Sequence, residues 1–147
     1  MENKKSLSEE DIKNRYITPA IEKSGWDKSF YRMEYYFTAG RILIQGKQHA
    51  RKEGKKADYI LFSSPNNPIA IVEAKDNNKP VGGGLQQAME YAKILDIPFA
   101  YSSNGDAFIE HDFLTGMETQ ISIEEFPTKK ALEDRIKANT PLTASQQ

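Results

Sequence analysis

Apolar residues recur at helical spacing near the start of the chain. Across residues 8–23 they line one side of a predicted helix, and Ser8 with Asp11 can form a capping box where it begins. Pro19 falls within this segment, and because it lacks a backbone N–H we expect it to kink or loosen the helix near Arg15. The apolar stripe consists of Ile12, Tyr16, Ile17, Ala20 and Ile21.

Short apolar runs bounded by turn residues predict strands along the rest of the chain. Polar, glycine-containing segments at 46–56 and 76–84 predict loops, and the first of them is basic. Helical spacing returns over 85–95, and a last helix is expected to begin near Thr128. The order of elements predicts an α/β protein with a mixed sheet flanked by helices. The expected strands cover residues 30–37, 41–45, 57–63, 69–75, 97–102 and 107–110.

Composition narrows the class of protein without naming a function. The 147 residues suit one domain, and with 38% hydrophobic and 28% charged residues the chain is typical of a globular protein rather than a disordered one. The absence of cysteine excludes disulfides and Cys-type zinc sites, and two histidines are too few for a His-rich metal site. No membrane span or secretory signal is visible, so we expect a cytoplasmic protein. The net charge of −1 means that a polyanion partner would need a local basic site.

A charged pair stands at the end of an apolar run in the segment IAIVEAKDNNKP, which begins at Ile69. Side chains alternate along a strand, so Glu73 and Lys75 are predicted to share one face with Ile69 and Ile71. If this strand pairs with the preceding one through the turn SPNNP, Asp58 lies near the Glu73–Lys75 end. A buried carboxylate costs several kcal/mol unless it is paired or binds a metal.

One divalent cation would account for all three charged residues. Asp58 and Glu73 could hold Mg²⁺, which binds a few carboxylates together with water and phosphate oxygens. The cation would polarise a phosphodiester and activate water, and Lys75 could orient or deprotonate that water. The alternative is a surface salt bridge, either Glu73 to Lys75 or Asp58 to Lys56, at a strand end where solvent begins.

Three further candidates lie outside these strands. Glu9, in the first turn of the N-terminal helix, is predicted to face the core and could be an outer or additional ligand; alternatively it only complements the helix dipole. Gln87 and Tyr91 are four residues apart and face the same way, so they could hold a phosphate or a nucleotide backbone. The alternative is that Tyr91 is core and Gln87 its polar border.

A basic segment directly precedes Asp58 and could bind phosphates despite the neutral charge of the whole chain. The alternative is a solvated loop. Glycines at 82–84 would allow the backbone to approach a nucleic acid closely, or form a flexible connector. The basic residues are Lys47, Arg51, Lys52, Lys55 and Lys56.

The ordered set Asp58, Glu73, Lys75, Gln87 and Tyr91 resembles the PD-(D/E)xK nuclease superfamily, in the subgroup with a Q-x-x-x-Y motif. Ala57 stands where that superfamily has a proline that is not a ligand. Longer runs between residues 9 and 127 are similar to the N-terminal endonuclease domain of the type I restriction enzyme R subunit. These runs are SEEDIKNRYITPAIEKSGWD, FTAGRI, KKADYILF, IAIVEAKD, GLQQAMEYAKILDIPFAYSSNGD and EEFPT.

The resemblance implies a restriction-endonuclease-like core and Mg²⁺-dependent cleavage of unmethylated double-stranded DNA after ATP-driven translocation. It implies that Asp58 and Glu73 are metal ligands, Lys75 is the catalytic lysine and Glu9 is the acid of the first helical motif. Gln87 and Tyr91 would serve nuclease function or DNA contact.

The same resemblance implies partners: motor domains of a longer chain, which would bind ATP, and the methyltransferase and specificity subunits. We therefore expect residues 8–127 to form the core, and 128–147 to be a helix and tail that lead toward motor domains missing here.

Two other functions remain open at this point. The chain could be a nuclease-fold module that binds DNA or a partner and influences translocation without cutting. It could also be a stand-alone repair or junction-resolving nuclease of the same fold.

Overall fold

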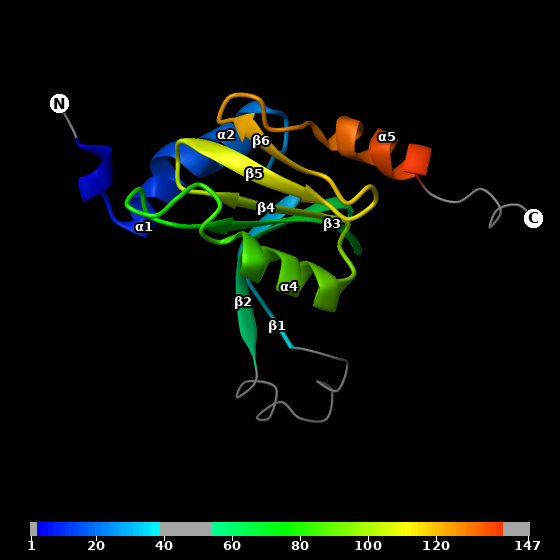
Figure 1. Ribbon diagram of the computed structural model, residues 1–147. Coiled ribbons are helices and arrows are strands. Elements are labelled where there is room, and N and C mark those ends of the chain that lie inside the picture. The colour runs from blue at the N-terminus through cyan, green and yellow to red at the C-terminus, as the bar shows by residue number, and fades with distance from the viewer. Residues whose placement is uncertain (1–2, 39–53, 140–147) are drawn as a thin grey trace, which may run out of the picture.

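A six-stranded mixed sheet lies between two layers of helices in the computed structural model (Figure 1), which describes residues 3–38 and 54–139. The strands follow one another across the sheet in chain order. Every neighbouring pair is antiparallel except β3 and β4, which are parallel. The strands are β1 Tyr31–Phe37, β2 Lys55–Ser64, β3 Asn67–Ala74, β4 Phe99–Ser103, β5 Ala107–Asp112 and β6 Glu118–Ser122.

Helices cover both faces of the sheet, and one face is covered because the parallel β3–β4 connection needs a crossover. That crossover contains α4, Leu85–Leu95, whose Ala88 and Ala92 pack with Ile60 and Ile71 on one face. The larger apolar cluster on the other face includes Trp26, Tyr101 and Phe108 together with the remaining helices. These are α1 Glu9–Ile12, the π-helical turn η2 Lys13–Ile17, α2 Thr18–Lys23 and α5 Lys129–Asn139; a short 3₁₀ turn, η1 Lys4–Ser6, precedes them.

The N-terminal helix confirms two predictions made from its sequence. Ser8 and Asp11 form the capping box, with the Asp11 N–H donating to Ser8 Oγ at 3.0 Å. The helix is also loosened ahead of Pro19, since η2 interrupts it and Pro19 lies in the first turn of α2. A missing proline N–H removes one helical hydrogen bond, which a wider turn accommodates.

Some boundaries differ from those expected. Lys55 and Lys56 are not in a loop; they begin β2 and pair with Phe37 and Tyr36 of β1. Ile69 packs in the larger cluster rather than on the face of Ile71, because the β2–β3 register shifts between Leu61 and Phe62. β6 was missed because its residues are mostly exposed and show no alternation. The strand expected at 41–45 lies outside the described residues.

The last helix is fastened to the sheet by both apolar and ionic contacts. Leu132 is fully buried. Arg135 donates to both oxygens of Glu110 at 2.9 and 3.0 Å and to Asp112 at 2.7 Å. Both acids are nearly buried, so the guanidinium supplies the counter-charge that their burial requires. None of the helices in the described part of the chain is both long and apolar enough to cross a lipid bilayer.

Candidate active site

Asp58 and Glu73 lie side by side where β2 and β3 pair, as the sequence predicted. The Asp58 N–H donates to Glu73 Oε2 at 3.0 Å, and the Ala74 N–H donates to Asp58 Oδ2 at 2.8 Å. The exposed fractions of the two residues are 7% and 4%. Each carboxylate is therefore held by the backbone of the neighbouring strand, at a place where little water reaches it.

Burial and the neighbouring acid dominate the electrostatics of Glu73. Desolvation, followed by the charge of Asp58, raises the pKa of Glu73 to about 8. The amide of Gln87 donates to Glu73 Oε1 at 3.1 Å and works in the opposite direction. Among the described residues, neither a Glu73–Lys75 nor an Asp58–Lys56 ion pair forms, so the salt-bridge alternative does not account for these acids.

Lys75 follows directly after β3 and is half-buried beside the start of α4. Its N–H donates to the Ser103 carbonyl at 2.9 Å, which extends the pairing with β4 by one residue. A Cβ placed on Gly84 would lie 3.2 Å from Glu73 Cβ and 3.5 Å from Lys75 Cε. Glycine is needed here so that α4 can begin against the charged strand end.

Lys13 is a site residue that the sequence analysis missed. Its side chain is only 2% exposed, and its ammonium contacts Glu34 and lies 3.7 Å from Asp58 Oδ1. Burial of the ammonium lowers the pKa of Lys13, but the hydrogen bond to Glu34 and the charge of Asp58 outweigh it and raise that pKa. A signal was present, since Lys13 stands four residues before Ile17 within the apolar stripe.

Glu9 lies at the border of this site rather than in the core. The residue is exposed, yet partial burial and the charge of Asp58 raise its pKa, while Lys75 and Lys13 lower it. No group of three or more His, Cys, Asp or Glu side chains within 3–38 and 54–139 is placed to share a metal ion. Two carboxylates, those of Asp58 and Glu73, are thus the potential ligands in contact.

Gln87 and Tyr91 of the Q-x-x-x-Y motif also lie near Glu73. Gln87 bonds Glu73 directly, as described above. Tyr91 packs edge-on against Phe37 with ring centroids 5.0 Å apart. Its burial, followed by the charge of Glu73, raises the pKa of the phenol. Both side chains of the motif therefore lie on the α4 side of the acids.

The predicted basic segment is only partly described. Lys47, Arg51 and Lys52 lie outside the described residues. Lys56 is exposed and forms an ion pair with Glu34, and Lys55 is half-buried in β2.

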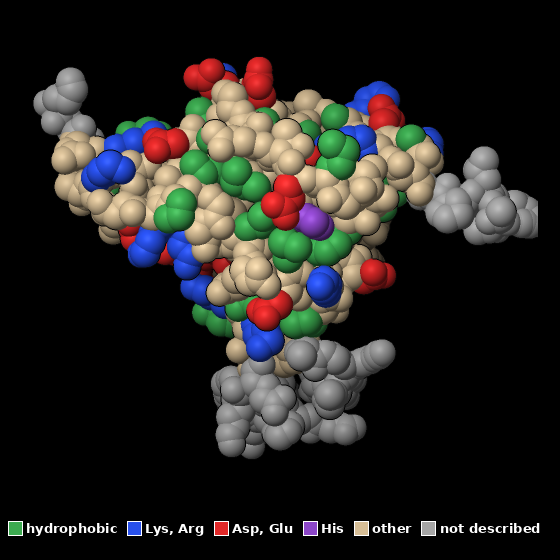
Figure 2. All heavy atoms as spheres, in the orientation of Figure 1, with side chains coloured by type: hydrophobic (Ala, Val, Ile, Leu, Met, Phe, Trp, Pro, Cys, Tyr) green, Lys and Arg blue, Asp and Glu red, His purple; other side chains and the backbone are tan. Residues whose placement is uncertain are grey.

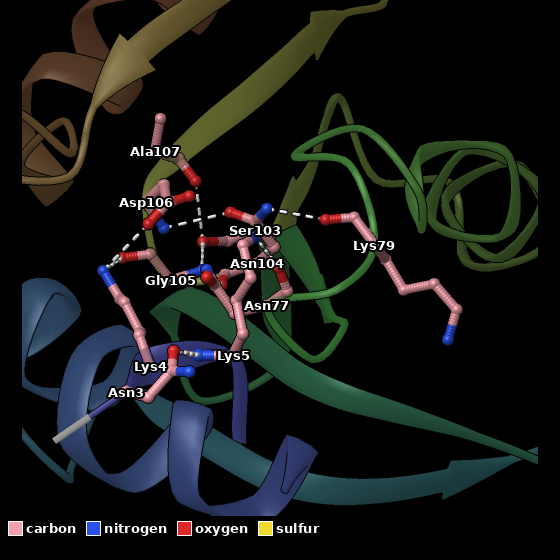
Figure 3. A network of polar contacts seen from close by, with 10 residues as sticks. All are labelled: Asn3, Lys4, Lys5, Asn77, Lys79, Ser103, Asn104, Gly105, Asp106 and Ala107. Atoms are coloured by element: carbon pink, nitrogen blue, oxygen red, sulfur yellow. Dashed lines mark hydrogen bonds and ion pairs between the residues drawn. The ribbon is translucent and has the colours of Figure 1, made fainter. Parts of the chain in front are cut away.

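The loops behind Lys75 are tied to the N-terminal segment by a polar network (Figure 3). Lys4 Nζ donates to the Gly105 carbonyl and Lys5 Nζ donates to the Asn77 carbonyl, each at 2.9 Å. Asn77 in turn donates to the Asn104 carbonyl at 2.8 Å. The turns that follow β3 and β4 are therefore held together. The backbone just after Lys75 is anchored at Asn77 by these hydrogen bonds.

The chain is similar to endonuclease subunits of type I restriction enzymes. The family described as "Type I restriction enzyme EcoKI endonuclease subunit second domain" matches residues 28–97. The chain is 38% identical over 135 residues to the type I restriction enzyme EcoAI endonuclease subunit of Escherichia coli, covering 88% of the chain and 17% of that protein. It is 32% identical over 104 residues to the EcoKI endonuclease subunit of E. coli strain K12, covering 64% of the chain and 8% of that protein.

A solved structure agrees with these matches. It is a fragment assigned as the HsdR subunit of a type I restriction enzyme from Vibrio vulnificus YJ016. The two folds superpose with a TM-score of 0.75 at 39% sequence identity, over 90% of this chain and 26% of that one. The chain therefore spans about a quarter or less of the length of each relative it matches.

Proposed function

The chain belongs with the N-terminal region of type I restriction enzyme endonuclease subunits, and we propose that it is a nuclease domain that hydrolyses phosphodiesters of double-stranded DNA with Mg²⁺. The homology supports a restriction endonuclease role. The observation that carries the finer proposal is the contact between Asp58 and Glu73, beside Lys75, at one end of two paired strands.

The donor set fits a divalent cation. Two nearly buried carboxylates lie against one another, and within the described residues Glu73 has no ion-pair partner. Such an arrangement is costly without added positive charge, because like charges in a poorly hydrated place repel. Oxygen ligands of this kind suit Mg²⁺ or Mn²⁺, which complete their coordination with water and phosphate oxygens. Asp58 and Glu73 would hold the ion.

Each side chain then has a defined task in hydrolysis. The bound ion would supply Lewis acidity and make water a better nucleophile. Lys75 would orient the attacking water and stabilise negative charge that develops on the phosphate. Gln87 keeps Glu73 oriented through its hydrogen bond. Glu9, at the border, would adjust the charge of the site rather than contribute a ligand.

DNA would approach the side of the molecule that carries Asp58 and Glu73. Lys and Arg side chains gather along the flank below α1 and beside α4 (Figure 2), where they could contact phosphates. Lys55 and Lys56, at the start of β2, are candidates for such contacts, as are Lys47, Arg51 and Lys52. Tyr91 would contact the backbone of the substrate from α4.

The relatives are several times longer than this chain, so further domains of such a longer protein enter the proposal. We propose that a motor in such a longer protein binds ATP and translocates DNA. The methyltransferase and specificity subunits would associate with that assembly, and recognition of the DNA sequence would belong to them.

The proposal is tested by titrating Mn²⁺ and Mg²⁺ into the chain in a calorimeter, alone and with a DNA duplex. Replacing Asp58 by Asn keeps the shape of the ligand and removes its charge. We expect the D58N variant to bind at least about tenfold more weakly, since one of two charged ligands is lost. Asp134→Asn, on the exposed side of α5, is the matched control.

Either of two results would contradict the proposed metal site. One is the absence of ion binding to the unmodified chain even with DNA present. The other is equal affinity in the unmodified chain and the D58N variant. Ion binding that is lost only in D58N, without any DNA cleavage, would instead favour the module that binds without cutting.

A further inference from the structure

Lys13 occupies a position where an apolar residue would be expected. It lies in η2, within the stripe through which the N-terminal helices pack on the sheet, and only 2% of its side chain is exposed. Its ammonium lies over the ring of Tyr59, 5.7 Å from the centroid. Burying an ammonium costs several kcal/mol unless acids compensate it, so a lysine here indicates a role for its charge.

Three carboxylates surround this ammonium. Glu34 contacts it directly, Asp58 Oδ1 lies 3.7 Å away and Glu10 Oε1 lies 3.9 Å away. The other oxygen of Asp58 is already bonded to the Ala74 N–H. Lys13 therefore faces Asp58 Oδ1, the carboxylate oxygen that the Ala74 N–H does not hold. The Asp58 carboxylate is thus oriented by Lys13 on one side and by the sheet backbone on the other.

Glu34 forms an ion pair with Lys13, and the backbone of Glu34 has an unusual conformation. It has a φ of +52°, a left-handed conformation that side chains other than glycine rarely adopt. Its neighbours Met33 and Tyr35 pair with Tyr59 and Ala57, the two residues that flank Asp58. The carboxylate of Glu34 is shared between Lys13 and Lys56, so a strained strand residue is held where it can neutralise part of the charge of Lys13.

We propose that Lys13 is a positioning residue that acts through Asp58, as a built-in counter-ion that orients this ligand and sets the affinity of the site for a divalent cation. The inference rests on the proposed metal site. Because the charge of Lys13 opposes a cation and the charge of Glu34 favours one, the two residues adjust affinity in opposite directions. A lysine that only fills space would have no such effect.

The two charges can be removed separately at nearly constant shape. Lys13→Met should bind Mn²⁺ more tightly, by roughly tenfold or more, because a nearby positive charge is gone. Glu34→Gln should bind Mn²⁺ more weakly, by several-fold, because the charge of Lys13 is then no longer shared. Lys13→Arg keeps the charge and should return the dissociation constant toward that of the unmodified chain. Lys129→Met, on α5 against Phe30, is the matched lysine control.

A second readout does not depend on calorimetry or on cleavage. Bound ligand stabilises the folded state by RT ln(1 + [L]/Kd), so tighter binding gives a larger rise in Tm at one Mn²⁺ concentration. The rise should therefore be larger for Lys13→Met than for the unmodified chain. If Lys13 only contributes packing, Lys13→Met lowers Tm by the same amount with and without Mn²⁺. Should Lys13→Met fail to fold, Glu34→Gln and Lys13→Arg carry the test.

Failure of this inference is distinct from failure of the proposed function. Equal or smaller Mn²⁺ shifts in Lys13→Met, or tighter binding in Glu34→Gln, would overturn the role of Lys13 while leaving the metal site standing. If the unmodified chain binds no Mn²⁺ with DNA present, the proposed metal site itself is overturned and the role of Lys13 falls with it.

Discussion

Glu73 accepts a hydrogen bond from the backbone N–H of Asp58 at 3.0 Å, so one acid of the site is tied to the residue that carries the other. The reverse bond runs from the Ala74 N–H to Asp58 at 2.8 Å. Both bonds cross between adjacent strands, whose positions are fixed by the ladder of the sheet. The pair is therefore pre-organised by the fold and does not depend on a mobile loop.

Lys75→Met should remove cleavage while leaving the fold intact. The methionine keeps the aliphatic stem that lies beside Gly83 and Gly84 but cannot donate to a phosphate or to water. We expect DNA nicking in Mn²⁺ to fall at least about 100-fold, the usual loss for a missing acid–base or electrostatic group. Stability should change little, because Lys75 forms no ion pair with another described residue. Cleavage of supercoiled plasmid and thermal unfolding provide the two measurements.

The control for this substitution is Lys79→Met. Lys79 lies in the same loop, and its ammonium is exposed and paired with Asp76. Its loss should reduce nicking only modestly, through weaker attraction of DNA. A Lys75→Met variant that still nicks at the rate of the Lys79→Met control would rule out the catalytic role of Lys75.

Most of the fold could be predicted from local pattern. The helix at 85–95 was predicted with the boundaries that the structure has, because its apolar stripe and the flanking glycine mark both its face and its start. The strand pair around Asp58 and Glu73 followed from two apolar runs and a short turn. β6 could not be predicted in this way, since an exposed edge strand owes its existence to pairing with β5 rather than to its own side chains.

The site was predictable where its residues adjoin buried strands or, as for Gln87 and Tyr91, share one face of α4. Asp58, Glu73 and Lys75 stand out as charges at the ends of apolar runs. For Lys13 the spacing indicates only that it lies on the apolar side of its helix, and for Glu34 it indicates nothing. Their proximity depends on how the N-terminal helices dock against β1 and on the left-handed backbone at Glu34. Neither the docking nor the backbone strain has a signature at the level of sequence spacing.

Gln87→Ala should slow cleavage without weakening DNA binding. The amide of Gln87 donates to Glu73 Oε1 at 3.1 Å, so its removal frees one ligand to rotate. Loss of a group that orients a ligand typically costs about 10–100-fold in metal affinity or activity. DNA affinity measured without divalent cations, and its dependence on salt, should stay the same. Gln86→Ala, an exposed neighbour on α4, is the matched control.

A different outcome would reassign Gln87. If Gln87→Ala weakens DNA binding several-fold while Mn²⁺ affinity is unchanged, then Gln87 contacts the nucleic acid rather than orienting Glu73. The Gln86→Ala control separates either result from a general effect of shortening a side chain on the same helix.

The stability of the chain should depend on pH through Glu73. Its pKa is raised to about 8 from an ordinary 4.5, first by burial and then by Asp58. Between these two values the folded chain keeps the proton and the unfolded chain has lost it, so stability falls as pH rises toward 8. The loss should be on the order of 5 kcal/mol, since one pKa unit corresponds to about 1.4 kcal/mol and the raised pKa already includes the opposing hydrogen bonds.

Glu73→Gln isolates this contribution because the amide has nearly the same shape and no charge. Relative to the unmodified chain, Glu73→Gln should gain stability between pH 6 and 9 in denaturant unfolding without divalent cations. Parallel stability curves for the two proteins would show that Glu73 does not carry the pH dependence. Saturating Mn²⁺ should stabilise the unmodified chain above pH 8 and have little effect on Glu73→Gln.

Gly84→Ala should disturb the site through contact alone, without altering its charge. The added Cβ would lie 3.2 Å from Glu73 Cβ and 3.3 Å from Ser102 Oγ, so these neighbours or the start of α4 must move. We expect a loss of about 1–3 kcal/mol of stability, together with slower nicking because Glu73 is displaced. At Gly82 the added Cβ would meet only Ile109 at an ordinary 3.5 Å, so Gly82→Ala is the matched control and should leave stability and nicking nearly unchanged. If the two alanine variants unfold at the same temperature and nick DNA equally fast, then close approach of α4 to Glu73 is not a requirement of the site.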